Sequence, residues 1–258
     1  MAKRRFSLPV FDLSVPLLVS VAVTFFVAGI VKGVTGMGLP TVAMGVLGAL
    51  ISPLAAANLL IIPSSVTNIW QLLAGPNITL LIRRLWPMML ALVVGTMLGS
   101  AWLAKGDTAP TTMALGIALV VYSGYTLLAH QLSVSKGLER ALSPLVGGVT
   151  GLITGATGVF VIPAVPYLQA LQLGKDDLVQ ALGLSFTVST VALAIGLAAR
   201  GAFQAENLAF SAFAVVPALA GMWFGQVLRG RIRPALFRRI FLLGLLLLGL
   251  EMTMRPFF

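Results

Sequence analysis

Lys32 is the residue of this sequence best suited to chemistry, because it is a cation inside a long apolar run. It is the only charged residue between Asp12 and Arg83. A charge inside a membrane segment costs from about 2.5 to well over 10 kcal/mol, so such a residue usually has a purpose. Lys32 adjoins a glycine-rich segment, where its ammonium can hold an anion. The alternative is that its long side chain snorkels to the membrane interface.

The glycine-rich segment beside Lys32 occurs twice. Gly33-Val34-Thr35-Gly36 returns as Gly155-Ala156-Thr157-Gly158. Where a helix breaks inside a membrane, the free N–H groups and the dipole of the next helix attract anions, and glycine permits the strained backbone. We therefore expect both breaks to bind substrate, with close helix packing through small residues as the alternative. The residues assigned to them are Lys32, Gly33, Thr35, Gly36, Gly38, Thr154, Gly155, Thr157 and Gly158.

The apolar segment after each break is unusually polar. Asn58, Ser65 and Asn68 are separated by seven and three residues, which places them on one helix face, and Ser185 and Ser189 share a face four residues apart. Neutral hydrogen-bond donors suit an oxyanion without trapping it, so these five residues complete the predicted substrate-binding set. Hydrogen bonds between helices, worth about 0.6 kcal/mol each, are the alternative role.

The composition predicts a protein embedded in a membrane. Of the 258 residues, 59% are hydrophobic and only 9% are charged, whereas ordinary soluble domains hold about 25% charged residues. This excludes a soluble globular domain and a disordered chain. The net charge of +10 comes from basic residues in short loops between apolar runs, so it indicates membrane topology and not nucleic-acid binding.

The apolar runs are expected to be helices, because they lack the ten-residue alternation of outer-membrane strands. The first run follows Lys3-Arg4-Arg5 and is interpreted as an uncleaved helix, since no small-residue cleavage site closes it. The predicted elements span residues 16–36, 39–51, 54–73, 86–104, 111–129, 143–157, 159–172, 178–199, 208–228 and 237–254.

Three landmarks recur at a nearly constant offset, which indicates an internal duplication. Besides the breaks, Gly95 and Gly99 return as Gly221 and Gly225, for which close helix packing is the favoured role. Gly106 and Pro110 likewise return as Gly230 and Pro234. The predicted organisation is a first transmembrane repeat (1–130), a basic loop (131–141) and a second repeat (142–258).

The loop charges predict how the repeats cross the membrane. Loops near 75–85, 130–141, 173–177 and 229–239 hold 10 basic residues, whereas loops near 105–110 and 200–207 and the C-terminal tail hold 3. If the first set lies inside, residues 142–172 must form a re-entrant hairpin, and the two repeats are inverted in the membrane. Pairs of broken segments in inverted repeats are typical of the binding sites of secondary transporters. The basic N-terminus does not fit an equivalent first hairpin, and its side of the membrane stays open.

The order of these features resembles the TauE/SafE (TSUP) family of sulfite exporters, from about Val21 to Met252. A broken segment (Gly29-Ile30-Val31-Lys32-Gly33-Val34-Thr35-Gly36-Met37-Gly38-Leu39-Pro40) is followed by a polar span and a Gly-xxx-Gly helix, and the pattern repeats from Gly147. The family's commoner Gly-x-Gly-Gly-Gly run reads Gly36-Met37-Gly38-Leu39 here. The resemblance implies an all-α multi-pass transporter of small anions, often sulfite or organosulfonates, in a bacterial plasma (inner) membrane.

Three other functions compete with this reading. The same fold can carry small carboxylates. An intramembrane enzyme would need a nucleophile and a base, and a Ser–Lys pair with Lys32 is the only candidate, so no enzyme is expected. A non-catalytic assembly factor is disfavoured by the duplicated breaks. We expect no cofactor and no metal. The expected partners are the anion and membrane lipids, and a homodimer stays open.

Overall fold

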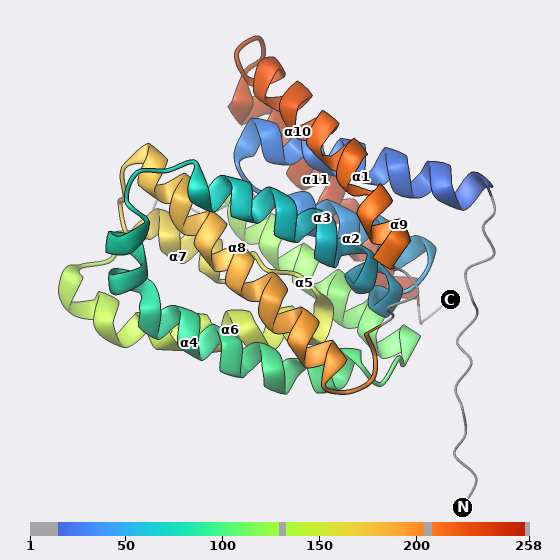
Figure 1. Ribbon diagram of the computed structural model, residues 1–258, viewed down its shortest axis with the longest axis horizontal. Coiled ribbons are helices and arrows are strands. Elements are labelled where there is room, and N and C mark those ends of the chain that lie inside the picture. The colour runs from blue at the N-terminus through green and yellow to red at the C-terminus, as the bar shows by residue number, and fades with distance from the viewer. Residues whose placement is uncertain (1–14, 129–132, 204–207, 256–258) are drawn as a thin grey trace, which may run out of the picture.

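The computed structural model describes residues 15–128, 133–203 and 208–255, and these residues form helices and connecting turns without a strand (Figure 1). Lys3, Arg4, Arg5 and residues 131–132 of the predicted basic loop lie outside the described residues. The helices are α1 (Val15–Thr35), α2 (Leu39–Leu50), α3 (Pro53–Leu73), α4 (Ile78–Leu103), α5 (Thr108–Leu128), α6 (Lys136–Thr157), α7 (Ala164–Ala170), α8 (Lys175–Ala198), α9 (Leu208–Phe213), α10 (Val215–Arg229) and α11 (Pro234–Met254).

The helices have the length and surface of a polytopic membrane protein. In the described part of the chain, α1, α4, α5, α8 and the run Leu208–Arg229 are long and apolar enough to cross a membrane. Large apolar side chains point outward: Leu98 is 64% exposed, Trp223 67% and Leu247 68%. Apolar exposure on this scale suits hydrocarbon and not water. The predicted all-helical, multi-pass class is confirmed.

Helices of the two halves pack in matching pairs around a buried interior. α1 packs against α10, and α6 packs against α4. α5 pairs with α11, and α3 pairs with α8. Figure 1 shows α1 and α2 as the two arms of a hairpin, and α6 followed by a return segment that ends in the short α7. α2 and most of α8 are buried, so the segments after the breaks form the interior.

The largest differences from the sequence-based boundaries lie at basic helix ends. α4 begins at Ile78 and not near residue 86, and α6 begins at Lys136 inside the predicted loop 131–141. Arg84 of α4 donates to Glu139 of α6 from Nε at 2.6 Å and from Nη2 at 2.8 Å. This pairing stabilises helical turns that a hydropathy pattern assigns to loops. Residues 159–163, predicted as part of the helical element 159–172, are not helical, and the run 208–228 is divided into α9 and α10.

Candidate functional site

The two glycine-rich segments break the chain with the same backbone geometry. Gly36 follows α1 with φ of 77°, and Gly158 follows α6 with φ of 72°. The N–H of each glycine donates to the carbonyl four residues earlier, that of Lys32 or of Thr154, at 2.7 Å in both breaks. This left-handed cap ends a helix and favours glycine, because a Cβ fits poorly at positive φ. The helices therefore break where the repeated sequence predicted.

Each break is braced by a threonine that the sequence assigned to substrate binding. Thr35 Oγ1 donates to the carbonyl four residues earlier at 2.8 Å and accepts from the N–H two residues later at 3.3 Å. Thr157 makes the same two contacts at 2.7 and 3.3 Å. Both hydroxyl groups are thus engaged with backbone. They shape the breaks in this structure, and substrate contact for them stays a prediction.

Close helix packing accounts for Gly33 and Gly155. A Cβ at Gly33 would collide with the carbonyl of Met222 on α10, and a Cβ at Gly155 with the carbonyl of Thr96 on α4. These contacts match the alternative role named for small residues in membrane helices. Gly38 has φ of 104°, and its neighbourhood is buried and tight. A direct role in binding for these three glycines remains a prediction.

The Gly-xxx-Gly helix α4 offers a test of this packing. A Cβ at Gly99 would collide with the carbonyl of Leu152 on α6. Gly99→Val should therefore lower the free energy of unfolding by roughly 1–3 kcal/mol, the usual cost of overpacking, measured by thermal unfolding in detergent. Gly124→Val on α5 is the matched control, because nothing lies within 4 Å of an added Cβ there. Equal stability of the two variants would contradict the packing role.

The side chain of Lys32 lies inside the protein and connects α1 to α3. It is 3% exposed, and its ammonium donates to Oγ1 of Thr67 at 3.1 Å and to Oδ1 of Asn68. Asn68 in turn donates from Nδ2 to Oγ1 of Thr190 on α8 at 3.3 Å. We call these four residues the Lys32 cluster. Its burial and its contacts with α3 disfavour the snorkelling alternative for Lys32.

The Lys32 cluster holds a cation among neutral partners. Thr67 and Asn68 accept from the ammonium without carrying charge, and the third ammonium proton has no acceptor among the described residues. A buried cation is costly when it is neither paired nor fully hydrogen-bonded. A cation with a spare donor, flanked by an amide and hydroxyl groups, is a suitable site for an anion.

Gln71 connects α3, the helix that carries Thr67 and Asn68, to the first break. Its Nε2 donates to the carbonyls of Gly36 and Val179, both at 2.9 Å, which ties α3 to the break and to α8. Its Oε1 is buried and accepts no hydrogen bond from the described residues. Movement of α3 would therefore act directly on the backbone of the break.

Asn58 and Ser65 do not join the Lys32 contacts. Asn58 precedes Asn68 by ten residues, about 15 Å along α3, and donates to the carbonyls of Leu54 at 3.0 Å and Ala202 at 3.2 Å. Ser65 is half-buried about one turn before Asn68. The structure thus brings Lys32 and Asn68 together but places Asn58 at another level of the same helix.

The second half has hydroxyl groups where the first half has a cation. Thr154 stands at the position of Lys32, and its Oγ1 donates to the carbonyl of Val159 at 3.2 Å. Ser185 and Ser189 are fully buried, and their hydroxyl groups form no hydrogen bond in the described part of the chain. They share a helix face with Gly196, which packs against Ser100 of α4. Both serines therefore face α4, away from Asn68.

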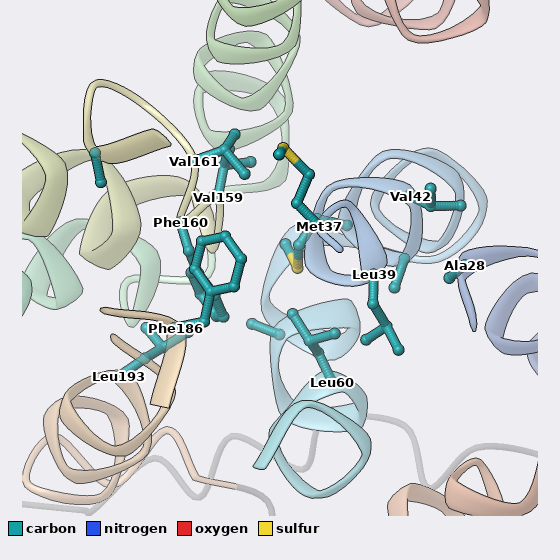
Figure 2. Close-up of a cluster of buried hydrophobic side chains, with 14 of the residues drawn as sticks. Ala28, Met37, Leu39, Val42, Leu60, Val159, Phe160, Val161, Phe186 and Leu193 are labelled. Carbon is teal, nitrogen blue, oxygen red and sulfur yellow. The ribbon is translucent and has the colours of Figure 1, made fainter. Parts of the chain in front are cut away.

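An apolar cluster fills the space between the two breaks. Met37 and Leu39 come from the first break and Val159, Phe160 and Val161 from the second, and all are buried. Figure 2 shows these side chains converging with those of α3 and α8, among them Leu60 and Phe186. The breaks thus face one another across a closed, apolar partition, with the Lys32 cluster lying among helices that border it.

The sequence pattern singled out Lys32 and Asn68, but it did not single out Thr67 and Thr190, which contact them, or Gln71, which contacts the first break. Thr67, Gln71 and Thr190 stood among the polar residues of the two segments, yet nothing in the spacing set them apart from their neighbours. The adjacency of Thr67 to Asn68 is the one usable signal, because a long side chain from another helix can reach two successive residues.

A comparison with protein-family models shows which family the chain belongs to. The model of the family described as "Sulfite exporter TauE/SafE" matches residues 21–252 of the chain. The chain belongs to the TauE/SafE family. The resemblance drawn from the repeated breaks is therefore confirmed. No curated protein and no solved structure matches the chain. Membership in a family of sulfite exporters indicates a membrane protein that exports anions and favours transport over catalysis.

Proposed function

We propose that this TauE/SafE protein is a secondary transporter that moves sulfite or a small organosulfonate across the bacterial plasma membrane. The Lys32 cluster is its central binding site. The observation that carries the proposal is the buried Lys32 ammonium beside the break, which has neutral partners and a spare donor. A sulfur oxyanion supplies both the negative charge and the acceptor oxygens that this group needs. Among the residues that the structure describes, Lys32 contacts Thr67 and Asn68 and no nucleophile–base pair, so transport suits the cluster better than an intramembrane reaction.

The two halves act as inverted repeats in this proposal. Support comes from the glycine contacts between helices. A Cβ at Gly29 of α1 would meet Ala218 of α10, and 122 residues later a Cβ at Gly151 of α6 would meet Leu92 of α4. The partner on α4 stands 126 residues before the partner on α10. Exchanged packing of this kind is what a two-fold relation between the halves produces, and inverted halves are the common design of secondary transporters.

The hairpins around the breaks are proposed to be re-entrant. The two ends of the second hairpin lie together, since Val134 N–H donates to the carbonyl of Ala170 at 3.0 Å. Tyr167 of α7 adds a hydroxyl contact to Ser143 of α6 at 2.7 Å. A segment whose ends meet enters and leaves on one side. Irregular backbone at its tip is tolerated because it is enclosed by protein.

The closed partition supports alternating access as the transport mechanism in this proposal. The apolar cluster between the breaks blocks a continuous path, so the anion crosses only if helices on one side separate while those on the other stay packed. Gln71 links α3 to the first break, so binding at Asn68 on the same helix can be transmitted to the backbone of the break.

Flux into liposomes that contain the purified protein tests the proposal. The panel is sulfite, methanesulfonate, sulfoacetate, sulfate and the small carboxylates acetate and lactate at equal concentrations. We expect saturable uptake of sulfite or a sulfonate and at least tenfold slower uptake of the carboxylates, the ratio given by a difference of about 1.4 kcal/mol. Faster uptake of the carboxylates would show that small carboxylates, and not sulfur oxyanions, are the substrate class. No uptake of any of these anions above that of protein-free liposomes would refute transport.

A further inference from the structure

Lys32 is unusual for a buried cation because no carboxylate among the described residues forms an ion pair with it. Among the described residues the two ion pairs are Arg84–Glu139 and Arg255–Glu251. The ammonium contacts only a hydroxyl and an amide oxygen. An isolated charge at this depth is expensive, so the amine is stable there either with a bound anion or without its proton.

The charged groups around α1 lie at helix ends and are exposed or half-exposed. α10, packed on α1, carries Arg229 at its end, and α11 carries Arg238, Arg239 and Glu251. α2 and α3 carry no charged residue. α8, which reaches the cluster through Thr190, has Lys175, Asp176 and Asp177 in its first turn. None of these groups forms an ion pair with Lys32.

The second half shows that the fold does not need a charge at this position. Thr154 stands in place of Lys32, four residues before the break glycine, and the same N–H to carbonyl contact closes both breaks at 2.7 Å. Helix packing and break geometry are therefore served by a neutral side chain. The charge of Lys32 therefore serves a function that a hydroxyl group cannot perform. A lysine, unlike an arginine, can also release its proton.

We propose that Lys32 binds one proton together with each anion, so that the protein co-transports protons with its substrate. This inference rests on the proposed transport function. The proton passes from water to Nζ of Lys32 as the anion binds, and it returns to water on the other side as the anion leaves. Only an N–H bond forms and breaks. With a monovalent anion, the loaded site (ammonium plus anion) and the empty site (neutral amine) both carry no net charge, so both states can change conformation without moving an unbalanced charge through the membrane.

Co-transport sets a relation between the two gradients. An anion that accumulates inside the cell leaves with a proton. Net export stops when the ratio of the internal to the external anion concentration equals the ratio of the external to the internal proton concentration. Each unit of pH difference is worth about 1.4 kcal/mol, so it offsets an anion gradient of about tenfold. An exporter of this kind works against an acidic exterior only while the internal anion concentration is high.

Proton movement with methanesulfonate tests the inference. This anion of a strong acid does not cross the bilayer as a neutral acid. Liposomes containing the protein and a trapped pH-sensitive dye receive an inward methanesulfonate gradient, with valinomycin and equal potassium on both sides to hold the membrane potential at zero. We expect the interior to acidify by one proton for each anion that enters. Anion uptake without acidification would overturn the inference and leave transport intact, whereas absence of uptake for methanesulfonate and for every other anion of the panel would overturn both.

The Lys32→Arg variant separates anion binding from proton release. Arginine keeps its proton at every accessible pH, so the site stays positive after the anion leaves. We expect exchange of labelled for unlabelled methanesulfonate to persist, whereas net uptake with acidification falls at least tenfold. This loss corresponds to an increase of about 1.4 kcal/mol in the activation free energy of net uptake. Lys105→Arg, the same change at a surface lysine, should keep both activities. Net proton-coupled uptake by Lys32→Arg would overturn the inference. If the variant does not fold, the number of protons that enter per anion with the wild-type protein tests the inference on its own.

Discussion

Replacing Lys32 with threonine should raise the half-saturation concentration for a sulfur oxyanion by roughly ten- to a hundredfold, because a hydrogen bond to a charged group is worth about 1.5–3 kcal/mol. Threonine is the residue that the second half carries at this position, so the change respects the packing of the fold. The measurement is initial uptake against anion concentration in liposomes of matched protein content.

Lys105→Thr is the control for Lys32→Thr. It removes the same charge from the surface, where Nζ of Lys105 lies 5.6 Å from the ring centre of Trp102. We expect it to leave the half-saturation concentration within about twofold, since an exposed charge contributes little. A tenfold weaker anion affinity in both variants would show a general effect of positive charge, and unchanged affinity in Lys32→Thr would remove Lys32 from the binding site.

Valine at either break glycine should abolish transport while leaving membrane insertion largely intact. At Gly36 the cause is backbone conformation alone, because the nearest atom to an added Cβ would be Val179 Cγ2 at 3.9 Å. A branched residue at positive φ costs of order 1–3 kcal/mol and changes the course of the break. At Gly158 a steric cause is added, since a Cβ would lie 2.7 Å from Cε of Met44.

Asparagine distinguishes these two causes, because it tolerates the left-handed conformation. We expect Gly36→Asn to retain a large share of the wild-type flux and Gly158→Asn to lose it unless Met44 is shortened to alanine as well. Surface expression and gel filtration report insertion, and uptake reports function. Normal transport by both valine variants would contradict a role for the breaks in the transport cycle.

The breaks could be located from the sequence because two physical signals coincide there. Glycine at Gly36 and Gly158 permits a positive φ, and the repeat fixed both positions at once. The helix starts were less accessible. The segment beginning at Lys136 reads as a basic loop, and its helical turns are stabilised by the pairing of Arg84 with Glu139, which no local pattern reveals. The return segment 159–172 is apolar throughout, but apolarity alone does not separate extended chain from helix.

The composition of the site depends on helix contacts that residue spacing does not encode. Lys32 reaches Thr67 and Asn68 because its long side chain extends from α1 to α3, and Asn68 reaches Thr190 because α3 packs against α8. Asn58 and Asn68, which the spacing placed on one helix face, lie too far apart along α3 to meet one ligand. Ser185 and Ser189 share a face as predicted, but that face is turned toward α4.

Reaction of a single cysteine beside the Lys32 cluster tests most directly whether this site opens to both sides of the membrane. The chain has no cysteine, and Ser64 is fully buried on α3 one turn before Asn68, so Ser64→Cys introduces one nearly isosteric thiol. We expect a membrane-impermeant thiol reagent to modify this cysteine from either side, and sulfite or methanesulfonate to slow both reactions. Modification from one side only, or rates that the anion does not change, would contradict an alternating-access site at Lys32.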